Sequence, residues 1–498
     1  MIKRVLIANR GEIALRIVHA CRELGVETVA VYSDADVRAP HVAAADRSVH
    51  IGAAPALESY LSIERLIDAA RRSGADAVHP GYGFLSQNPA FASACEKAGI
   101  VFIGPPASVL AQMGSKIAAR RLMETAGVPI VPGETPRDQS DSGIAAAVDR
   151  VGLPILVKAS AGGGGKGMRQ VEPGGNVAEA VQAARREAIA AFGDGTLYVE
   201  RLIPRPRHVE VQVFADNHGN VAHLFERECS VQRRHQKVIE ESPSPVANAR
   251  LRSRMTEAAV RAARASSYRN AGTVEFLVDA SAGRGAERFY YLEMNTRLQV
   301  EHGVTEQVTG VDLVRAQLLV ASNEPLPWPS ASVTQRGHAI EARVYAEDPA
   351  RGFLPQAGRI LLYREPRMPG IRVDSGVEEG SDVPLHYDPL LAKVIATSAT
   401  RDEAIRRLVC ALREFPILGI HTNIEFLIGI LEHPRFRAGD LETGWLDAEG
   451  ASLAPAGPVE VPGHVQAAIA AYESESESQV EGPAARPDPW QRLREWRA

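Results

Sequence analysis

The sequence predicts an α/β protein that begins with a parallel sheet and continues into further mixed units. Strand-like and helix-like stretches alternate at the N-terminus, first RVLIAN, then GEIALRIVHACRELG, then ETVAVYS. This alternation is typical of parallel strands connected by helices. At 498 residues the chain is too long for a single core, and about three domains are expected. A proline-rich stretch, EPLPWPSASV, indicates a joint near residue 330.

The first hundred residues continue the same pattern. ERLIDAARRSG predicts a helix, ADAVHP a strand, and ACEKAGIVFIGP the end of a helix followed by a strand. Such a unit often binds a dinucleotide, which requires GxGxxG after the first strand. The first turn here, NRGEIA, has a single glycine, so NAD binding is excluded.

The middle of the chain opens with a helix, SKIAARRLMETAG, and passes through three prolines to the strand LPILVKA. Beyond Arg201 the strands HVEVQVFAD and NVAHLFERE are expected, then a helix, ARLRSRMTEAAVRAARASS, then the strands TVEFLVD and FYYLEMN. A third unit of strands and helices is expected from about residue 337 to 445. The run ESESESQVEGPAARPDP predicts an acidic linker.

Composition narrows the classes of function. Lys and Arg number 56 against 61 for Asp and Glu, and this net charge of -5 argues against a nucleic-acid partner. No run approaches the ~20 apolar residues of a membrane span, and no signal peptide is apparent, so a cytoplasmic protein is expected. The cysteines are too far apart for a zinc site and are expected to be reduced thiols. They are Cys21, Cys95, Cys229 and Cys410.

The stretch KASAGGGGKGMR, Lys158 to Arg169, predicts a loop that wraps phosphates. It is not a Walker A loop, because Gly167 follows Lys166 where Ser or Thr is needed, and Ser160 stands where the first glycine is needed. A glycine loop can still close its backbone N–H groups over phosphates and open again. A flexible surface turn is the alternative.

In YLEMNTRLQVE, polar and apolar residues alternate, so an extended chain would place five polar groups on one face. They are Glu293, Asn295, Arg297, Gln299 and Glu301. If TVEFLVD and FYYLE pair as a hairpin, Glu275 can share that face with Glu293. Two carboxylates ~4 Å apart repel by about 4 kcal/mol at an effective dielectric near 20. A hard cation such as Mg²⁺ would relieve that repulsion. A solvated edge strand would give the same alternation.

The segment ERECSVQRRHQKVIEESP gathers basic groups and a glutamine, which could bind phosphates or a small anion. They are Arg227, Gln232, Arg233, Arg234, His235 and Lys237. An exposed basic turn is the alternative. We expect Cys229 to be a packing residue, since no base can be paired with it.

Taken together, these residues resemble biotin carboxylase, the ATP-grasp enzyme of biotin-dependent carboxylases. The resemblance is continuous from residue 1 to about residue 445. It rests on IANRGEIALRI, HPGYGFLS, KASAGGGGKGM, RHVEVQV, ECSVQRRHQK, GTVEFL, EMNTRLQVEH, AEDP, FLP and HYDPLLAKVI. It implies a Rossmann-like N-terminal domain at 1–113, an ATP-grasp domain at 114–330, a C-terminal biotin carboxylase domain at 335–445, and a tail at 446–498. The glycine loop would belong to a mobile lid at about 131–203.

The resemblance also implies roles for individual residues. Glu301 would be the base, acting with Arg297 and Lys237, and Arg343 would stabilise the biotin enolate. Bicarbonate would bind Lys237, Arg297, Gln299 and the backbone of Val300. The metal would bind Glu275, Glu293 and Asn295. ATP would bind Lys116, Lys158, Gly163, Gly164, Gly165, Lys166, Gly167, Glu200, Arg201, Ile203, His208, Gln232, His235 and Leu277.

The implied activity is ATP-dependent carboxylation of biotin by bicarbonate through carboxyphosphate, giving carboxybiotin, ADP and phosphate. This is the first half-reaction of acetyl-CoA carboxylase, in fatty acid biosynthesis, or of another acyl-CoA carboxylase. The cofactors implied are ATP, Mg²⁺ or Mn²⁺, and bicarbonate. The chain has no Met-Lys-Met tripeptide, so biotin is expected on a separate carrier protein. The expected partners are that carrier, a second copy of the chain and a carboxyltransferase subunit.

Other interpretations stay open on the residues alone. The chain could serve a two-chain pyruvate carboxylase, since the first half-reaction is the same. EMNTRLQVEH and Arg343 argue against an ATP-grasp ligase of the carbamoyl-phosphate or purine-synthesis type, and the expected catalytic residues argue against an inactive scaffold. Lys166 stands where some family members have arginine. The tail PDPWQRLREWR either docks a partner through Trp490 and Trp496 or is a truncation remnant.

Overall fold

The computed structural model describes residues 2–160, 167–279, 281, 283, 287–328, 332–454 and 466. The described residues up to Ala454 form one compact unit. Several predicted residues lie outside the described ones, namely Gly163, Gly164, Gly165, Lys166, Trp490 and Trp496.

The chain begins with a five-stranded parallel sheet in the spatial order β3-β2-β1-β4-β5. Its strands are β1 (Arg4–Ile7), β2 (Glu27–Ser33), β3 (Arg47–Gly52), β4 (Ala77–His79) and β5 (Val101–Phe102). Its helical segments are α1 (Gly11–Glu23), η1 (Asp34–Asp36), α2 (Pro40–Ala44), η2 (Ala56–Glu58), α3 (Ile63–Ser73) and α4 (Pro89–Lys97). In β1, Ile7 packs with Ile13 of α1, whereas Leu6 packs with Leu66 of α3. Because successive side chains point to opposite faces, helices cover both, and the predicted parallel sheet is confirmed.

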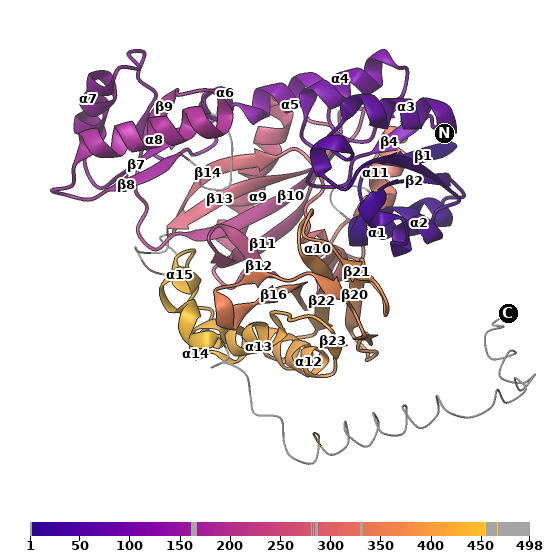
Figure 1. Cartoon of the computed structure of the whole chain (residues 1–498). Helices are drawn as coiled ribbons and strands as arrows, with labels where there is room; N and C mark the ends of the chain where they lie inside the picture. Colours follow the sequence, from indigo (N-terminus) through magenta and orange to yellow (C-terminus); the bar gives the residue numbers. More distant parts are fainter. Residues whose placement is uncertain are drawn as a thin grey trace, which may run out of the picture. The chain divides into compact units, whose positions relative to one another are not determined.

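A small lobe around a core of its own follows the linking helices α5 (Ala107–Gly114) and α6 (Lys116–Thr125). We name it the lid lobe. It consists of β6 (Gly133–Glu134), α7 (Asp141–Val151), β7 (Ile155–Ala159), β8 (Met168–Val171), α8 (Val177–Phe192) and β9 (Leu197–Arg201). Its antiparallel sheet has the order β6-β9-β7-β8, and α7 and α8 lie together beside it (Figure 1). Ser140 and Asn176 cap the two helices by accepting hydrogen bonds from backbone N–H groups.

An eight-stranded antiparallel sheet forms the centre of the compact unit, in the order β14-β13-β10-β11-β12-β15-β22-β20. Its strands are β10 (Arg207–Ala215), β11 (Val221–Arg233), β12 (Gln236–Ser242), β13 (Asn270–Asp279), β14 (Arg288–Asn295), β15 (His338–Tyr345), β20 (Ile371–Ser375) and β22 (Leu390–Ser398). The expected hairpin of TVEFLVD and FYYLE is the β13–β14 pair, with Glu275 opposite Glu293. Strands β12 and β15 pair across the joint expected near residue 330, so one sheet spans it. The domain limits themselves stay predictions.

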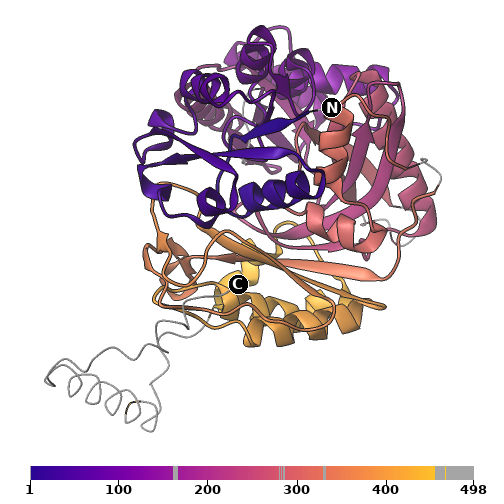
Figure 2. The same ribbon diagram turned by 90° about the vertical axis from the view of Figure 1, so that its right-hand side faces the viewer.

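Helices cover this large sheet. Helix α9 (Ala249–Ala265) shares a core with β10 and β13, and α12 (Arg401–Arg413) packs on β15 and β22. Figure 2 shows the C-terminal helices, orange to yellow, along one face of the strands. The remaining helical segments are α10 (His302–Thr309), α11 (Leu313–Ala321), η3 (Pro349–Arg351), α13 (Ile424–Glu432), α14 (Pro434–Ala438), α15 (Trp445–Glu449) and η4 (Gly450–Leu453). Three short strand pairs complete the fold: β16 (Glu347–Asp348) with β17 (Leu354–Pro355), β18 (Gly358–Arg359) with β21 (Asp382–Val383), and β19 (Leu362–Tyr363) with β23 (Ile417–Leu418).

Two further expectations concern membrane spans and thiols. Within the described residues, every helix is too short or too polar to cross a bilayer. The four cysteines are all free thiols, as expected, with Cys410 exposed and the other three buried.

Candidate active site

A cavity of about 240 Å³ opens between the lid lobe and the large sheet. Strands β7 and β9 of the lid lobe face β10, β13 and β14 across it. It is lined by Lys116, Val131, Leu156, Lys158, Met168, Glu200, Arg201, Leu202, Ile203, Pro206, His208, Gln232, His235, Leu277, Leu292, Glu293 and Thr443. Ten of the residues predicted to bind ATP are among the described ones. Nine of them line this cavity, and Gly167 is the exception. Apolar residues at one part of the wall and cations at another suit a ligand with a flat ring and an anionic end.

Glu200 binds Lys158, a cation of this cavity, together with Arg120, which lines the adjoining cavity. The ammonium of Lys158 donates to one carboxylate oxygen of Glu200 at 2.9 Å, and the guanidinium of Arg120 donates to the other at 2.6 Å. Burial alone would lower the pKa of Lys158, but Glu200 and Tyr198 raise it. Lys158 therefore stays charged although it is buried.

Lys116, at the start of α6, is the second cation of the cavity. Burial and the neighbouring ammonium of Lys158 both lower the pKa of Lys116. Two ammonium groups held close together repel each other, and an anion placed between them would relieve that repulsion. The pair is therefore suited to binding phosphate oxygens.

Gly167 marks the point where the glycine loop returns to the lid sheet. Its carbonyl accepts a hydrogen bond from the backbone N–H of Ala159 at 3.0 Å. Its φ is +71°, and an added Cβ would lie 2.8 Å from the Cβ of Ala159. Only glycine fits both the left-handed backbone and this close approach.

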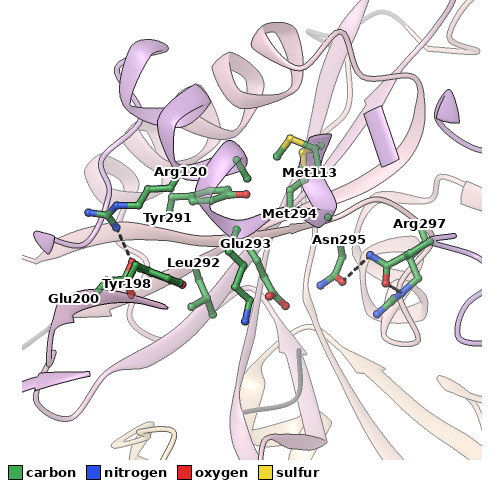
Figure 3. A pocket seen from close by; sticks show the side chains of 14 residues that line it. Met113, Arg120, Tyr198, Glu200, Tyr291, Leu292, Glu293, Met294, Asn295 and Arg297 are labelled. Carbon is green, nitrogen blue, oxygen red and sulfur yellow. Dashed lines mark hydrogen bonds and ion pairs between the residues drawn. The ribbon is translucent and has the colours of Figure 1, made fainter. Parts of the chain in front are cut away.

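A second cavity, of about 390 Å³, adjoins the first along β14. Figure 3 shows Asn295 and Arg297 toward one end of it, Arg120, Tyr198 and Glu200 toward the other, and Glu293 between them. The two cavities share Lys116, Glu200, Leu292 and Glu293. The carboxylate of Glu293 thus borders both spaces, where a ligand with several phosphates would place its charge.

Glu275 is the centre of a buried polar network on the large sheet. Its Oε1 accepts hydrogen bonds from Asn295 at 2.7 Å, Lys237 at 3.0 Å and Gln299 at 3.0 Å. His208 lies 2.8 Å from the other carboxylate oxygen. Burial alone would raise the pKa of Glu275, but Lys237 and His208 lower it well below its ordinary value. Residues predicted for metal and for bicarbonate therefore meet at one carboxylate.

Glu301 lies beyond this network, in the turn before α10, and is buried. Its two carboxylate oxygens are held separately, Oε1 by Lys237 at 2.6 Å and Oε2 by Arg343 at 3.0 Å. Lys237 and Arg343 lower the pKa of Glu301 well below its ordinary value, although burial alone would raise it. The carboxylate is therefore ionised and can accept a proton.

Glu210 is a residue of this centre that carries no prediction from the sequence. It lies opposite Glu275 across β10 and β13, and it accepts hydrogen bonds from Lys237 at 2.6 Å and from Arg227 at 2.5 Å. Arg227, which the sequence predicts as a donor to phosphates or a small anion, is fully buried and donates to Glu210 and Gln212 within the protein. The alternation Glu210, Gln212 in HVEVQV could have indicated Glu210, since it repeats the polar pattern of the strand beside it.

A third cavity, of about 310 Å³, is lined by Arg343 and by Val300, the residue before Glu301. Arg343 also forms an ion pair with Glu240, and Glu240 together with Glu301 raises the pKa of Arg343 well above its ordinary value, against the effect of burial. The cavity is lined by Asn9, Arg10, Gly11, Glu12, Ile13, Tyr82, Gly83, Phe84, Arg297, Val300, Arg343, Tyr345, Tyr387, Asp388 and Leu390. Its aromatic and cationic walls suit a small, flat, polar group.

The expectation that Glu293 to Glu301 share one face of an extended strand is only partly right. Strand β14 ends at Asn295, and Glu301 lies in a turn. The guanidinium of Arg297 donates to the carbonyl of Leu298 at 3.0 Å and to Gln299 at 2.5 Å, which folds the chain back on itself. Four of the five polar groups still join one network around Glu275 and Lys237, through the turn rather than through strand periodicity. They are Asn295, Arg297, Gln299 and Glu301.

Besides the predicted set of Glu275, Glu293 and Asn295, two other groups of side chains could hold a cation. Within the described residues, His208, Glu210 and Glu275 bring possible ligand atoms within 4.8 Å of one another, as do Glu210, Cys229 and Glu301. In both sets the carboxylates already neutralise Lys237 or Arg227. Glu293 instead opens onto two cavities, and hard cations prefer such oxygen ligands. This favours the predicted set of Glu275, Glu293 and Asn295.

Comparison with known families agrees with this geometry. Residues 1–110 match the family model "Biotin carboxylase, N-terminal domain" and residues 341–448 match "Biotin carboxylase C-terminal domain". Residues 115–328 match "Carbamoyl-phosphate synthase L chain, ATP binding domain". A biotin carboxylase of Halalkalibacterium halodurans is 49% identical over 446 residues, which are 90% of this chain and 97% of that protein.

The chain belongs to the biotin carboxylase family. It therefore has the ATP-grasp fold, and the resemblance of its motifs to that family is confirmed. Among curated relatives in the family, the mitochondrial methylcrotonoyl-CoA carboxylase alpha chain of Glycine max is 51% identical over 446 residues. The alignment covers 90% of this chain but only 60% of that protein. The chain thus spans about three fifths of the length of that relative.

Solved structures of the biotin carboxylase family superpose closely. A biotin carboxylase of Campylobacter jejuni in complex with β,γ-ATP has a TM-score of 0.86 at 43% identity, covering 90% of this chain and 99% of that chain. The biotin carboxylase domain dimer of the Hydrogenobacter thermophilus 2-oxoglutarate carboxylase, with MgADP, ADP and bicarbonate, also has a TM-score of 0.86. It is 42% identical and covers 92% of this chain and 100% of that one.

Proposed function

We propose that the chain catalyses the ATP-dependent carboxylation of biotin by bicarbonate. The observation that carries the proposal is the position of Glu301, whose ionised carboxylate lies between Lys237 and Arg343. Lys237 connects Glu301, through Glu275, to His208 in the lining of the nucleotide cavity. Arg343 connects Glu301 to the third cavity, which Arg343 itself lines. A base linked to both cavities suits a reaction in which an activated group forms at one cavity and is transferred at the other.

The first step would activate bicarbonate. The anion would be held by Lys237, Arg297, Gln299 and the backbone of Val300. Glu301 would accept the proton of bicarbonate while a bicarbonate oxygen attacks the γ-phosphate of ATP. When Lys237 turns toward bicarbonate, Glu301 loses its closest cation, so the pKa of Glu301 would rise toward that of a useful base. Lys116 and Lys158 would offset charge on the transferring phosphoryl group.

Mg²⁺ fits the site by the chemistry of its donors, since Glu275, Glu293 and Asn295 offer oxygen ligands beside the two cavities. When bound, the ion would neutralise charge on the phosphate oxygens. Closure of the lid lobe would exclude water from the reacting groups. Arg201, Ile203 and Leu277 would then bind the base of the nucleotide, with His208, Gln232 and His235 beside them.

The second step would transfer the carboxyl group. Carboxyphosphate would break to CO₂ and phosphate, and the phosphate would take the proton from biotin N1′. Arg343, which is charged at any accessible pH, would stabilise the ureido enolate that results. The N1′ nitrogen would then attack CO₂, which gives carboxybiotin, ADP and phosphate.

The partners belong to the same proposal. Biotin would be presented by a carrier protein, and a carboxyltransferase would use the product. An acetyl-CoA carboxylase of fatty acid synthesis is one such system and a two-chain pyruvate carboxylase is another. A pyruvate carboxylase subunit of Methanothermobacter thermautotrophicus is 49% identical over 448 residues, or 90% of this chain and 90% of that protein. A homodimer is supported by the dimeric domain from Hydrogenobacter thermophilus.

The experiment is bicarbonate-dependent ADP release by the purified chain, with and without free biotin. We expect bicarbonate-dependent release that biotin stimulates several-fold. Release that needs bicarbonate but ignores biotin would contradict biotin as the acceptor. Absence of release with Mg²⁺, bicarbonate and biotin all present would overturn the proposed activity.

A further inference from the structure

Lys393 is a buried, charged residue of the large sheet, in the strand next to the edge strand β20, and the steps above do not use it. It lies in β22 and has 0% of its surface exposed. Its direct neighbours across the sheet are Arg343 on β15 and Asp374 on β20. Two buried cations therefore stand opposite each other, an arrangement that is destabilising unless each has its own anionic partners.

Arg343 and Lys393 do have separate partners. Arg343 pairs with Glu240 and Glu301. Lys393 pairs with Glu12 at 3.1 Å and with Asp374 at 3.6 Å. Burial alone would lower the pKa of Lys393, but Glu12, Glu341 and Asp374 raise it, so the ammonium is charged. An apolar residue at this buried position would avoid the cost of burying a charge, which suggests that the charge has a use.

The contact that distinguishes Lys393 is with a backbone atom of the active site. Its Nζ donates to the carbonyl oxygen of Val300 at 2.8 Å. That carbonyl belongs to the peptide that joins Val300 to Glu301. Fixing it sets the orientation of this peptide, and with it both the N–H of Glu301 and the start of the Glu301 side chain.

The turn that contains this peptide is held by side chains and, among the described residues, has no neighbouring strand as a partner. Beyond Asn295 the chain leaves β14, and regular helical structure resumes only at His302. The ring of His302 lies 2.8 Å from the carbonyl of Gln299 on one side of the turn. Lys393 holds the other side, so its ammonium replaces the sheet hydrogen bonds that the turn has given up.

Lys393 also reaches the wall of the third cavity. Its partner Glu12 accepts a hydrogen bond from the hydroxyl of Tyr82, and both residues line that cavity with Arg343. One ammonium therefore connects the first turn of α1, strand β20 and the turn that carries Glu301. Its three N–H donors face Val300, Glu12 and Asp374.

We propose that Lys393 is a positioning residue, which holds the Val300–Glu301 peptide where bicarbonate binds and ties it to the Glu12–Tyr82 wall. This rests on the proposed function, because Val300 and Glu301 are assigned to bicarbonate there. The consequence is specific. Loss of Lys393 weakens bicarbonate binding much more than ATP binding, because its contacts reach the turn and the third cavity but not the nucleotide cavity.

The test compares Lys393→Met with Asp374→Asn. The methionine keeps the length of the side chain and removes the charge, whereas Asp374→Asn disturbs the same buried network without touching Val300. We expect Lys393→Met to raise the KM for bicarbonate at least about tenfold and to leave the KM for ATP within about threefold. Asp374→Asn should change both by less than about threefold, and Lys393→Arg should recover part of the loss. Equal effects of Lys393→Met and Asp374→Asn on bicarbonate would overturn the proposal.

A second readout needs no activity. Hydrogen–deuterium exchange of peptides covering residues 296–303 should become faster in Lys393→Met and stay unchanged in Asp374→Asn. If Lys393→Met does not fold because Glu12 is left unpaired, the double variant Lys393→Met/Glu12→Gln replaces it. If the parent chain shows no bicarbonate-dependent ADP release, the proposed function fails, and the exchange result alone decides whether Lys393 holds the turn. Unchanged exchange at 296–303 would refute that role.

Discussion

The ammonium of Lys237 and the carboxylate of Glu301 are 2.6 Å apart in a buried site. The same ammonium also reaches Glu210 and Glu275, so one cation faces three carboxylates. Removing one of these charges changes the balance of the others, and the buried site cannot screen the change with water.

Replacing the proposed base gives the most direct prediction. Glu301→Gln keeps the shape of the side chain but cannot accept a proton. We expect bicarbonate-dependent ADP release to fall by about 10²-fold or more, whereas the Kd for ATP changes by less than about threefold, because Glu301 does not line the nucleotide cavity. Steady-state kinetics and nucleotide titration measure the two quantities. Turnover near that of the parent would exclude Glu301 as the base.

Arg343 is predicted to act only in the step that involves biotin. Arg343→Lys keeps the charge but loses the planar guanidinium, whose Nη2 contacts both Glu240 and Glu301. We expect biotin-stimulated ADP release to fall at least about tenfold, with the release seen without biotin reduced much less. Arg351→Lys, at an exposed arginine of η3, is the control. A loss of equal size with and without biotin would assign Arg343 to the earlier step.

Lys158 is predicted to bind the phosphates of ATP. In Lys158→Met, Glu200 keeps only Arg120 as its partner and the cavity loses one of its two ammonium groups. A charge-assisted hydrogen bond of this kind contributes about 1.5–3 kcal/mol, so the KM for ATP should rise at least about tenfold. Lys97→Met, on the exposed end of α4, should leave it unchanged. An unchanged KM in Lys158→Met would contradict the assignment.

Titration with Mg²⁺ can distinguish the predicted donor set from the set of His208, Glu210 and Glu275. If Glu275, Glu293 and Asn295 hold the ion, Glu293→Gln should raise the Mg²⁺ concentration for half-maximal activity about tenfold, because a charged ligand is lost. His208→Asn removes a ligand of the other set and should shift it much less. Activity measured against free Mg²⁺ in a buffered series distinguishes the sets, and the opposite order of effects would favour His208, Glu210 and Glu275.

A buried histidine makes the N-terminal sheet sensitive to acid. Burial, together with Arg10, lowers the pKa of His41 to about 4, and its Nδ1 has no partner among the described residues. Because His41 is protonated more readily in the unfolded chain than in the folded one, the protein loses stability as the pH falls from about 6.5 toward about 4. Over that window its contribution to the free energy of unfolding changes by about 1.4 kcal/mol per pH unit. The free energy of unfolding, measured in urea between pH 5 and 6.5, should rise with pH less steeply in His41→Asn and His41→Phe than in the parent, by that amount per pH unit. A parent-like slope in both variants would exclude His41 as the cause.

Much of the fold could be predicted from local pattern. The alternation of RVLIAN, GEIALRIVHACRELG and ETVAVYS corresponds to β1, α1 and β2, because hydrophobic periodicity reports directly on which faces are buried. The Glu275–Glu293 pair was also predictable, since both strands of that hairpin are short and joined by a short loop. These features depend on residues close in the sequence.

Contacts between distant segments could not be predicted in this way. Glu210 meets Lys237 and Arg227 because β10, β11 and β12 pair in one register, and no local pattern fixes that register. From the sequence alone, Lys393 is one cation within a largely apolar strand, LLAKVIATS. Its partners Glu12 and Val300 lie in other parts of the chain, and only the assembled fold brings them within reach.

The pairing of β12 with β15 has a consequence for dissecting the protein into pieces. Arg343 lies on β15, the strand that pairs with β12. The residue proposed for the last chemical step therefore belongs to the strand that satisfies the backbone hydrogen bonds of β12. A fragment that stops near residue 330 would leave the N–H and C=O groups of β12 unpaired. Such a bare edge recruits other strands, so self-association would accompany the loss of activity. Expressing the first two predicted domains alone would therefore yield an aggregating polypeptide rather than a nucleotide-binding half enzyme.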